Sequence, residues 1–177
     1  LITGAKAWHF ANGKNNRWKD SLKQQIKNHN YSDKVFISFG CIDCRKHEGI
    51  LPYSIKTHKD ISEVCEKTIK DYLQYMEANL SLKYLKRYYF GVPAISKTKK
   101  LTDELDIKRI EMVRLYNSIL KTEVLSRGSY FVDVYALTSN NDGENNNIYM
   151  CDQFHLSPKC LSILFENHLY EPKSISQ

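Results

Sequence analysis

Apolar residues along the chain recur with two spacings, and segments with one spacing alternate with segments of the other. A repeat of three to four residues predicts the buried face of a helix, whereas a short β-branched and aromatic run predicts a buried strand. The predicted elements are a helix over 15–28, a strand over 35–39, a helix from Asp60 to Met76, a strand over 84–92, a helix from Thr102 to Arg127, a strand over 130–137 and a helix from Ser157 to Leu169. Strands that alternate with helices of this length predict an α/β domain with three layers, α/β/α, around a parallel sheet.

Capping residues mark several of these boundaries. Asp60 is a predicted N-cap because its carboxylate can accept backbone N–H groups of the first turn, and Glu63 completes the pattern three residues later. Ser157 followed by Pro158 is a strong helix start, since proline needs no N–H partner at the first helical position. The Asn-rich tract 140–147 has few groups that could pack, so we expect a polar surface loop there.

Length and composition restrict the classes of protein to consider. The chain has 177 residues, 42% of them hydrophobic and 26% charged, which favours one globular domain spanning 1–177 and excludes wholesale disorder. No apolar run approaches the roughly 18 residues that a membrane helix needs, so no membrane partner is expected. Lys plus Arg number 26 and Asp plus Glu 20, and the resulting charge of +6 is spread along the chain, which does not indicate nucleic acid as a partner.

Five cysteines, an odd number, do not predict a disulfide framework in a chain of this length. Reduced thiols, and with them a cytoplasmic location, are the expected state. The chain begins at Leu1 without an initiator Met and without the apolar centre of a signal peptide, from which we expect that an upstream part has been removed.

Glycine and polar residues follow the predicted strands where loops would leave the sheet. In a parallel α/β sheet the functional groups gather beyond the carboxyl ends of the strands, and here those loops start with Gly4, Gly40, Gly91 and the segment 151–155. Glycine permits tight turns and a close approach of backbone N–H groups to a substrate, although such glycines are also ordinary turn residues.

His155 is the sharpest candidate for chemistry. Asp152 lies three residues before it, so that the carboxylate can orient the imidazole while the other ring nitrogen faces a pocket as a general base. Asp and His are also common near helix starts, and on spacing alone a capping role stays open.

These segments resemble the motifs of the SGNH hydrolases, also called GDSL esterases. Asp152-x-x-His155-Leu-Ser-Pro is similar to the last motif of that family. The run over 39–45, Phe-Gly-Cys-Ile-Asp-Cys-Arg, is similar to the third motif, Gly-x-Asn-Asp, and Gly4 with its neighbours to the second. The resemblance covers nearly the whole chain and implies a flavodoxin-like fold with the strand and helix order predicted above. No cofactor and no metal are expected.

The resemblance implies a role for each matching residue. In the family a serine attacks an ester carbonyl, so His155 would act as base and then as acid, and Asp152 would hold it in the productive tautomer. Gly4 would donate an N–H to the oxyanion. Gly40 and Asp43 are the glycine and aspartate of the third motif.

Two departures from the family pattern bear on activity. Ile42 stands where the family has the asparagine whose amide donates to the oxyanion, and Arg45 or His47 would have to replace that donor. The family's first motif, Gly-Asp-Ser, which supplies the nucleophile, has no counterpart in the chain. We therefore expect the first strand and its serine to lie upstream of residue 1.

The sequence thus predicts an ester hydrolase or O-acyltransferase of SGNH type, acting on an acylated carbohydrate or another small polar ester by Ser/His/Asp covalent catalysis. The alternative is a non-catalytic domain that keeps the fold as a ligand-binding or interaction module. The expected partners are a small-molecule or glycan ester substrate and an upstream N-terminal segment of the same protein.

Some of these residues also allow a metal or redox interpretation. Cys41-x-x-Cys44, with His47, Cys151 and His155, is conceivable as a zinc site or a redox pair. A structural zinc site usually shows a second tight pair of ligands, which this sequence lacks, so buried or surface thiols are the simpler interpretation.

Three further alternatives concern charged and aromatic residues. Asp43 and Arg45 could form a salt bridge that fixes their loop, or Arg45 could point into a pocket to bind an anion. Basic residues between tyrosines over 83–89 could form a nucleic-acid surface, but alternating strand faces explain them more simply. Trp8 and His9 could wall a sugar site, but packing under the sheet edge is the expected place for the aromatic ring.

Overall fold

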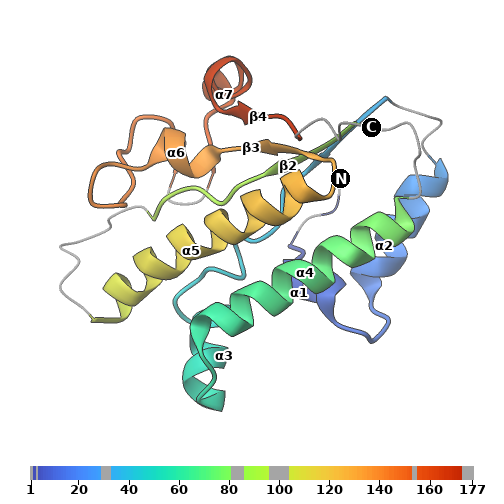
Figure 1. The fold of residues 1–177 in the computed structure, drawn as a ribbon, viewed down its shortest axis with the longest axis horizontal. Coiled ribbons are helices and arrows are strands. Elements are labelled where there is room, and N and C mark those ends of the chain that lie inside the picture. The colour runs from blue at the N-terminus through green and yellow to red at the C-terminus, as the bar shows by residue number, and fades with distance from the viewer. Residues whose placement is uncertain are drawn as a thin grey trace.

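Figure 1 shows the fold in a computed structural model, which describes residues 2, 4–28, 33–80, 86–95, 104–152 and 155–172. The elements of these segments, in chain order, are α1 (Ala7–Ala11), α2 (Arg17–Asn28), β1 (Lys34–Ile37), α3 (Ile50–Thr57), α4 (Ile61–Asn79), β2 (Lys86–Phe90), α5 (Glu104–Ser126), β3 (Tyr130–Val132), α6 (Val134–Thr138), the 3-10 helix η1 (Pro158–Cys160), α7 (Leu161–Asn167) and β4 (Leu169–Tyr170).

The described strands form one sheet in the order β1-β2-β3-β4. β1 and β2 are parallel with Phe36 opposite Tyr88, β2 and β3 are parallel with Tyr88 opposite Tyr130, and β4 runs antiparallel to β3. The parallel strands and alternating helices confirm the predicted α/β class, and β4 is an antiparallel addition to the predicted parallel sheet. Among the described strands β1 pairs with β2 alone.

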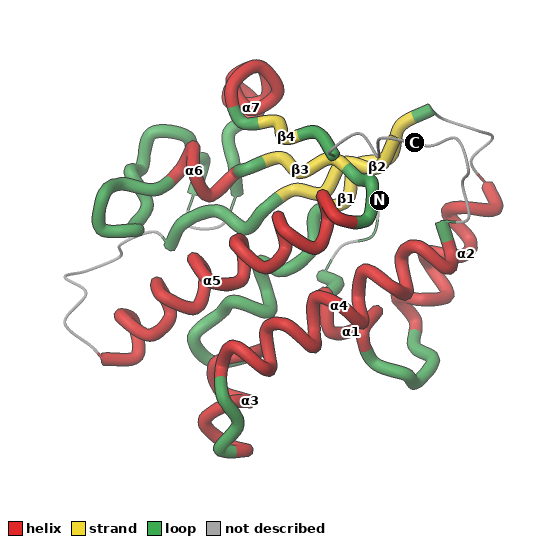
Figure 2. The backbone as a smooth tube through the Cα atoms, in the orientation of Figure 1, coloured by secondary structure: helices red, strands yellow, loops and turns green. Residues whose placement is uncertain are grey.

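Helices cover both faces of the sheet (Figure 1), and the strands lie between the two helical layers (Figure 2). Alternate side chains of a strand point to opposite faces. Tyr89 and Phe131 therefore pack in a larger core with α1, α4 and α5, whereas Tyr88 and Val132 pack in a smaller core with Leu164 of α7. This is the predicted α/β/α layering.

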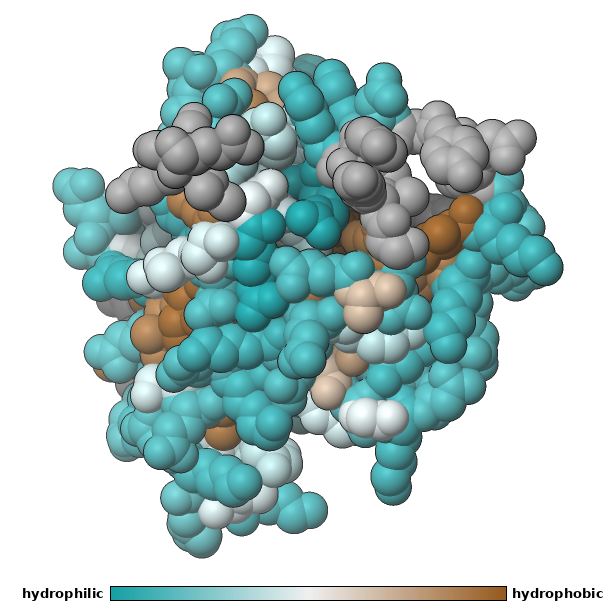
Figure 3. All heavy atoms as spheres, turned by 45° about the vertical axis from the view of Figure 1, so that its right-hand side comes forward, coloured by the Kyte–Doolittle hydropathy of each residue, from teal (hydrophilic) through white to brown (hydrophobic). Residues whose placement is uncertain are grey.

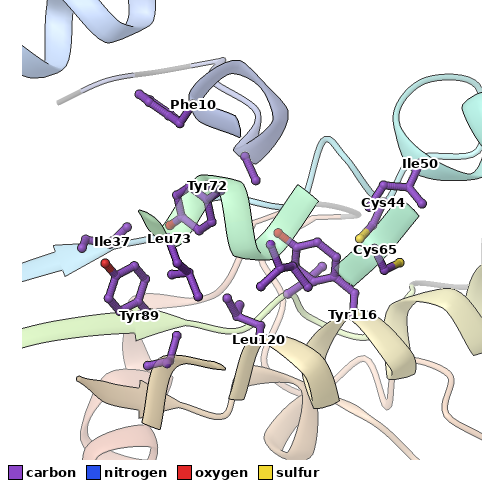
Figure 4. Packing of buried hydrophobic residues seen from close by; sticks show 14 of the residues in the cluster. Phe10, Ile37, Cys44, Ile50, Cys65, Tyr72, Leu73, Tyr89, Tyr116 and Leu120 are labelled. Carbon is purple, nitrogen blue, oxygen red and sulfur yellow. The ribbon is translucent and has the colours of Figure 1, made fainter. Parts of the chain in front are cut away.

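The larger core lies between α4, α5 and the sheet. Figure 4 shows Tyr72 and Leu73 of α4 together with Tyr116 and Leu120 of α5 and the strand residue Tyr89, and each of these side chains is at most 2% exposed. Full burial of an apolar side chain of this size contributes about 1.5–3 kcal/mol to stability. The helical apolar spacing of these two segments includes Tyr72, Tyr116 and Leu120, which are buried as it predicts, but it does not include Leu73.

Helix starts agree with the sequence where a cap is present. Asp60 caps α4, since its Oδ1 accepts the N–H of Ser62 at 2.7 Å and that of Glu63 at 3.3 Å. Ser157 caps the last helical segment by accepting the N–H of Lys159 at 3.4 Å. The first turn of that segment is the 3-10 helix η1, which then continues into α7.

Two predicted boundaries were wrong. The strand predicted over 130–137 has only three residues, because Asp133 accepts the N–H of Ala136 at 3.0 Å and starts α6. The last helix ends at Asn167, and Leu169, predicted on its apolar side, pairs in β4 instead. In the first case a local cap overrides the apolar pattern, and in the second the pairing of Leu169 with the distant Val132 does so.

Some elements were not predicted, and some predictions cannot be compared. The helices α1 and α3 have only five and eight residues, too few to establish a helical repeat in the sequence. Pro52 lies in the first turn of α3, where a missing N–H is tolerated. The predicted helix start at Thr102 and the predicted strand start at Tyr84 lie outside the described residues.

The tract 140–147 was predicted as a polar surface loop, and residues 140–142 and 147 are indeed exposed, but its middle, residues 143–145, is buried. Asn145 is 3% exposed, its backbone N–H donates to the Ile95 carbonyl at 2.9 Å, and its side-chain amide donates to the Ala94 carbonyl at 2.9 Å. Asparagine side chains here bond to backbone groups that have no secondary-structure partner. A polar composition is thus compatible with burial in this segment.

The surface is mainly hydrophilic on the face that Figure 3 shows, where apolar side chains form separate patches. None of the described helices has both the length and the apolar composition that crossing a bilayer requires. Four aromatic side chains of the described residues are prominently exposed: Trp8, Phe36, Tyr53 and Tyr170.

Gly40 provides a test of this fold. Its φ is 117°, and an added Cβ would lie 2.7 Å from Tyr116 Oη and 2.9 Å from Tyr116 Cε1. We expect Gly40→Ala to lower the free energy of unfolding by about 2–4 kcal/mol, the sum of backbone strain and overlap with a buried ring, as measured by urea unfolding. Gly13→Ala is the matched control, because an added Cβ there meets nothing within 4 Å. Equal losses in the two variants would contradict this account of Gly40.

Candidate functional site

The contact predicted between Asp152 and His155 is formed. His155 Nδ1 lies 2.7 Å from Asp152 Oδ2, and the backbone N–H of His155 donates to Asp152 Oδ1 at 2.8 Å. Because the two oxygens of one carboxylate hold the ring and the backbone, the orientation of the imidazole is fixed. The His155 side chain is 76% exposed, so most of the ring is accessible from solvent.

A short turn positions this dyad. The N–H of Cys151 donates to the His155 carbonyl at 2.8 Å, and the N–H of Ser157 donates to the Tyr149 carbonyl at 2.8 Å. Ser157 then caps η1, so the chain enters the last helical segment directly after the turn. The hydrogen bonds that orient His155 therefore come from its own turn, which is why spacing in the sequence could predict them. Residues 153 and 154, between the two partners, lie outside the described part of the chain.

Asp43 is a buried anchor for α1. Its side chain is 0% exposed, its Oδ2 accepts the N–H of Ala7 at 2.8 Å, and its Oδ1 accepts the N–H of Trp8 at 3.0 Å. These N–H groups belong to the first turn of α1 and have no partner within the helix. Burial raises the pKa of Asp43 to about 6, although the N–H groups of Trp8 and Ala7 act in the opposite direction. The contact ties the segment that follows Gly4 to the loop that follows β1.

The loop around Asp43 closes on itself at Gly49. Gly49 has a φ of 97°, and an added Cβ would lie 2.1 Å from the Asp43 carbonyl oxygen. The same oxygen accepts the N–H of Ile50 at 2.8 Å, and the backbones of Cys44 and Gly49 pair in antiparallel fashion. Only glycine can adopt this φ at so close an approach, so the loop has one compact conformation.

Arg45 pairs with Glu48, which replaces the salt bridge to Asp43 considered from the sequence. Arg45 Nη1 lies 2.8 Å from Glu48 Oε1, and Lys6 Nζ lies 2.8 Å from Glu48 Oε2. Hydrogen bonds from Lys6 and Arg45 hold the pKa of Glu48 below its usual range. Glu48 is 40% exposed, so the network contributes little to stability, but it gathers two cations beside the segment that follows Gly4.

The predicted site residues therefore fall into two groups. Asp43, Arg45 and Gly4 belong to segments that the Asp43 and Glu48 contacts join, while Asp152 and His155 form their own turn after α6. The segments after β1, β2 and β3 leave the sheet at the same edge because the three strands are parallel (Figure 1). The buried Gly40 shapes the exit from β1, and the exposed Gly4 has a φ of 68°.

The cysteine pair does not form a metal site with its neighbours. Cys41 is exposed and Cys44 is buried, and all five cysteines are free thiols. Figure 4 shows Cys44 beside Cys65 in the core, and burial raises the pKa of Cys65 to about 12. Throughout the described segments, no group of three or more His, Cys, Asp or Glu side chains is placed to hold a metal ion.

The tyrosines of the segment 83–89 that the structure describes are buried. Tyr88 is 7% exposed and Tyr89 is 2% exposed, and they lie in the two different cores. This is the alternation of strand faces that the sequence suggested. Buried rings offer no stacking surface to a base.

Trp8 lines a cavity, which corrects the expectation that it packs under the sheet edge. It is 50% exposed and forms part of the wall of a cavity of about 710 Å³, to which Tyr53 of α3 also contributes. His9 lies elsewhere, stacked on Trp18 with ring centroids 3.6 Å apart.

Sequence reasoning missed two residues near the site. Glu48 lies three residues after Arg45, a spacing that could have suggested their ion pair, but nothing in the sequence links it to Lys6. Tyr53 belongs to the unpredicted helix α3, and no sequence signal indicated its place in the cavity wall.

Comparison with known proteins supports the fold. No protein-family model matches the chain, and no curated protein sequence matches it. Among solved structures, the chain is similar to a protein from Streptococcus pneumonia provisionally named a platelet activating factor, with a TM-score of 0.50 and 15% sequence identity. The match covers 84% of this chain and 64% of that protein. At this identity the likeness concerns the fold alone.

The raised pKa of Asp43 predicts a pH dependence of stability with a definite sign. Its carboxyl titrates at about 6 when folded, against 3.8 in the unfolded chain, so the folded protein binds the proton more tightly. The corresponding stability is fully present below the unfolded pKa and is lost as the pH rises through the folded pKa. The asparagine side chain of the Asp43→Asn variant cannot ionise. We therefore expect the free energy of unfolding of this variant, relative to that of the unmodified protein, to increase by about 2 kcal/mol between about pH 4 and about pH 7.

Chemical unfolding of both proteins at the two pH values measures this increase. Hydrogen bonds that the substitution changes shift the free energy of unfolding by the same amount at both pH values, so the difference between the two pH values reports the ionisation of Asp43. Asp60→Asn is a control of opposite sign, since hydrogen bonds from Ser62 and Glu63 lower the pKa of Asp60. The assignment fails if Asp43→Asn and the unmodified protein have the same pH dependence.

Proposed function

We propose that the protein is an ester hydrolase or O-acyltransferase of the SGNH type, acting on an acylated carbohydrate or another small polar ester. The observation that carries the proposal is the contact between His155 Nδ1 and Asp152 Oδ2 at 2.7 Å, combined with an imidazole that is 76% exposed. An imidazole oriented by a carboxylate is suited to act as the general base of acyl transfer. The α/β fold is compatible with such a site beyond the carboxyl ends of parallel strands.

The proposed reaction proceeds through an acyl-enzyme. A serine hydroxyl attacks the ester carbonyl while His155 Nε2 takes its proton, and the tetrahedral intermediate then releases the alcohol as the imidazolium returns the proton to it. Water or an acceptor hydroxyl attacks the acyl-serine by the same steps and regenerates the serine. Asp152 stabilises the imidazolium through Nδ1–H and does not itself take the proton. The serine is that of the family's first motif, which the proposal places upstream of Leu1.

Stabilisation of the oxyanion is assigned to Gly4 and Arg45. Gly4 would donate its backbone N–H, whereas Ile42 has no donor where the family has an asparagine. Loss of one oxyanion donor typically costs about 100- to 1000-fold in rate, so a replacement is needed. Arg45 is proposed for this role because its guanidinium is held by Glu48, close to the segment that follows Gly4.

A cytoplasmic location is part of the proposal. All five cysteines are free thiols. Disulfides persist in oxidising compartments and are rare in the cytosol, so this state supports the proposed location.

The test of the dyad uses the protein expressed from its complete reading frame and hydrolysis of p-nitrophenyl acetate. We expect His155→Ala to lower kcat/KM by about 1000-fold or more, and Asp152→Asn by a similar factor because the wrong tautomer is favoured. His58→Asn is the matched control, because it removes an exposed imidazole at a position whose φ of 54° suits asparagine.

The outcome separates the two candidate functions. Esterase activity that survives His155→Ala would reject the catalytic assignment. Absence of esterase activity with His155 intact would instead favour the non-catalytic module that keeps the fold for ligand binding.

Arg45 can be tested separately from the dyad. An oxyanion exists only along the reaction path, so Arg45→Ala should lower kcat by about 100-fold while changing KM little. Arg45→Lys keeps the charge and should recover part of the rate. A rise in KM at constant kcat would show that Arg45 binds the substrate in its ground state and would contradict the assignment.

A further inference from the structure

A cavity of about 710 Å³ lies between α1, α3 and the first half of α4. This volume falls in the range of about 300–1,000 Å³ that is typical of small-molecule sites. Its apolar lining includes Trp8, Tyr53, Ile50 and Val64, and its polar lining includes Lys59 and Glu63. The proposed reaction does not use any of these side chains.

Two aromatic rings in the cavity wall are exposed although their backbones are held in place. Trp8 is 50% exposed, and its backbone N–H donates to the carboxylate of the buried Asp43 at 3.0 Å. Tyr53 is 47% exposed, and its N–H donates to the Gly49 carbonyl at 3.2 Å. An accessible ring on a fixed backbone has only two side-chain torsions to lose when a ligand stacks on it, so these rings are suited to receive an apolar face.

The polar lining carries equal numbers of positive and negative groups. They are three lysines and three carboxylates: Lys6, Lys59, Lys67, Asp43, Glu63 and Asp71. Most of them already have partners, since Asp43 binds α1, Lys67 pairs with Asp71 at 2.7 Å and Lys6 pairs with Glu48 at 2.8 Å. A balanced lining does not favour a phosphate or another strongly charged ligand.

Lys59 and Glu63 are the lining charges whose side chains have no hydrogen bond or ion pair with another described residue. An ammonium group only donates hydrogen bonds and a carboxylate only accepts them. A hydroxyl does both, so a ligand rich in hydroxyl groups can satisfy both side chains at once. The combination of flat rings with one donor and one acceptor is the complement of a sugar, which has an apolar ring face and hydroxyls at its rim.

We propose that this cavity binds an uncharged saccharide, with sugar rings stacked on Trp8 and Tyr53 and hydroxyl groups bonded to Lys59 and Glu63. The inference deepens the proposed function and rests on it for the link to catalysis. Lys6 and Asp43 line the cavity and also belong to the segments that carry Gly4 and Arg45. A saccharide held here would therefore lie beside the proposed oxyanion site.

Calorimetric titration of the complete protein tests the proposal without any ester. The probes are neutral trisaccharides of glucose, xylose, mannose, galactose and N-acetylglucosamine, with trigalacturonate and inorganic phosphate as charged probes. We expect at least one neutral trisaccharide to bind with a Kd of about 1 mM or tighter, and Trp8→Ala and Tyr53→Ala each to weaken it by about tenfold or more. Trp8→Phe keeps a ring and should retain more of the affinity than Trp8→Ala.

Ile55→Ala is the matched control, because Ile55 is 52% exposed on α3 but does not line the cavity. The affinity of the Ile55→Ala variant for the trisaccharide should equal that of the unmodified protein. Thermal unfolding confirms that each variant is folded. His155→Ala should also bind normally, so failure of saccharide binding and failure of esterase activity are distinguishable. The proposal is overturned if no neutral trisaccharide binds, if a charged probe binds more tightly, or if Ile55→Ala weakens binding as much as Tyr53→Ala.

Discussion

The carboxylate of Asp43 is the contact on which the arrangement around the candidate site depends. It lies fully buried in the loop after β1 and accepts the backbone N–H groups of Ala7 and Trp8, thirty-six and thirty-five positions away in the chain. A buried charge is costly unless it is hydrogen-bonded, and a helix start leaves N–H groups without partners. The N–H groups at the start of α1 supply the hydrogen bonds that the buried carboxylate needs, and the carboxylate gives those N–H groups a partner. A helix of only five residues is therefore held in a defined place. This contact places the Trp8 wall of the cavity and, together with the ion pairs of Glu48 to Lys6 and Arg45, joins the Gly4 segment to the loop after β1.

Side-chain hydrogen bonds fasten the rest of the carboxyl edge of the sheet. The backbone of Val92 bonds to Asn117 through both its N–H, at 2.8 Å, and its carbonyl, at 3.0 Å. The backbone of Ala94 donates to Thr138 and accepts from Asn145, each at 2.9 Å. Loops at this edge cannot bond to a neighbouring strand, and buried polar side chains supply the missing partners. Such an edge is rigid although it contains little regular secondary structure, which is the condition a positioned site requires.

The two halves of the candidate site are built on different principles. The Asp152–His155 dyad is local, since its partners are three residues apart and its turn closes on itself. The half near Gly4 is assembled from distant segments by Asp43 and by Glu48, which joins Lys6 to Arg45. A local dyad keeps its geometry in many contexts, whereas the second half exists only in the folded chain. Activity would require both, so the second half is the more sensitive to changes elsewhere in the fold.

The sequence by itself determined the features whose cause is local. The apolar repeat of α4 with its Asp60 cap, the Ser157-Pro158 helix start and the three-residue spacing from Asp152 to His155 were all readable, because each partner lies within one helical turn. Only the tertiary structure decided that Asn145 is buried and that Trp8 is exposed in a cavity wall. The burial of a polar or aromatic side chain depends on which distant backbone groups lack partners and which helices lie alongside. That information arises only when segments far apart in the chain meet.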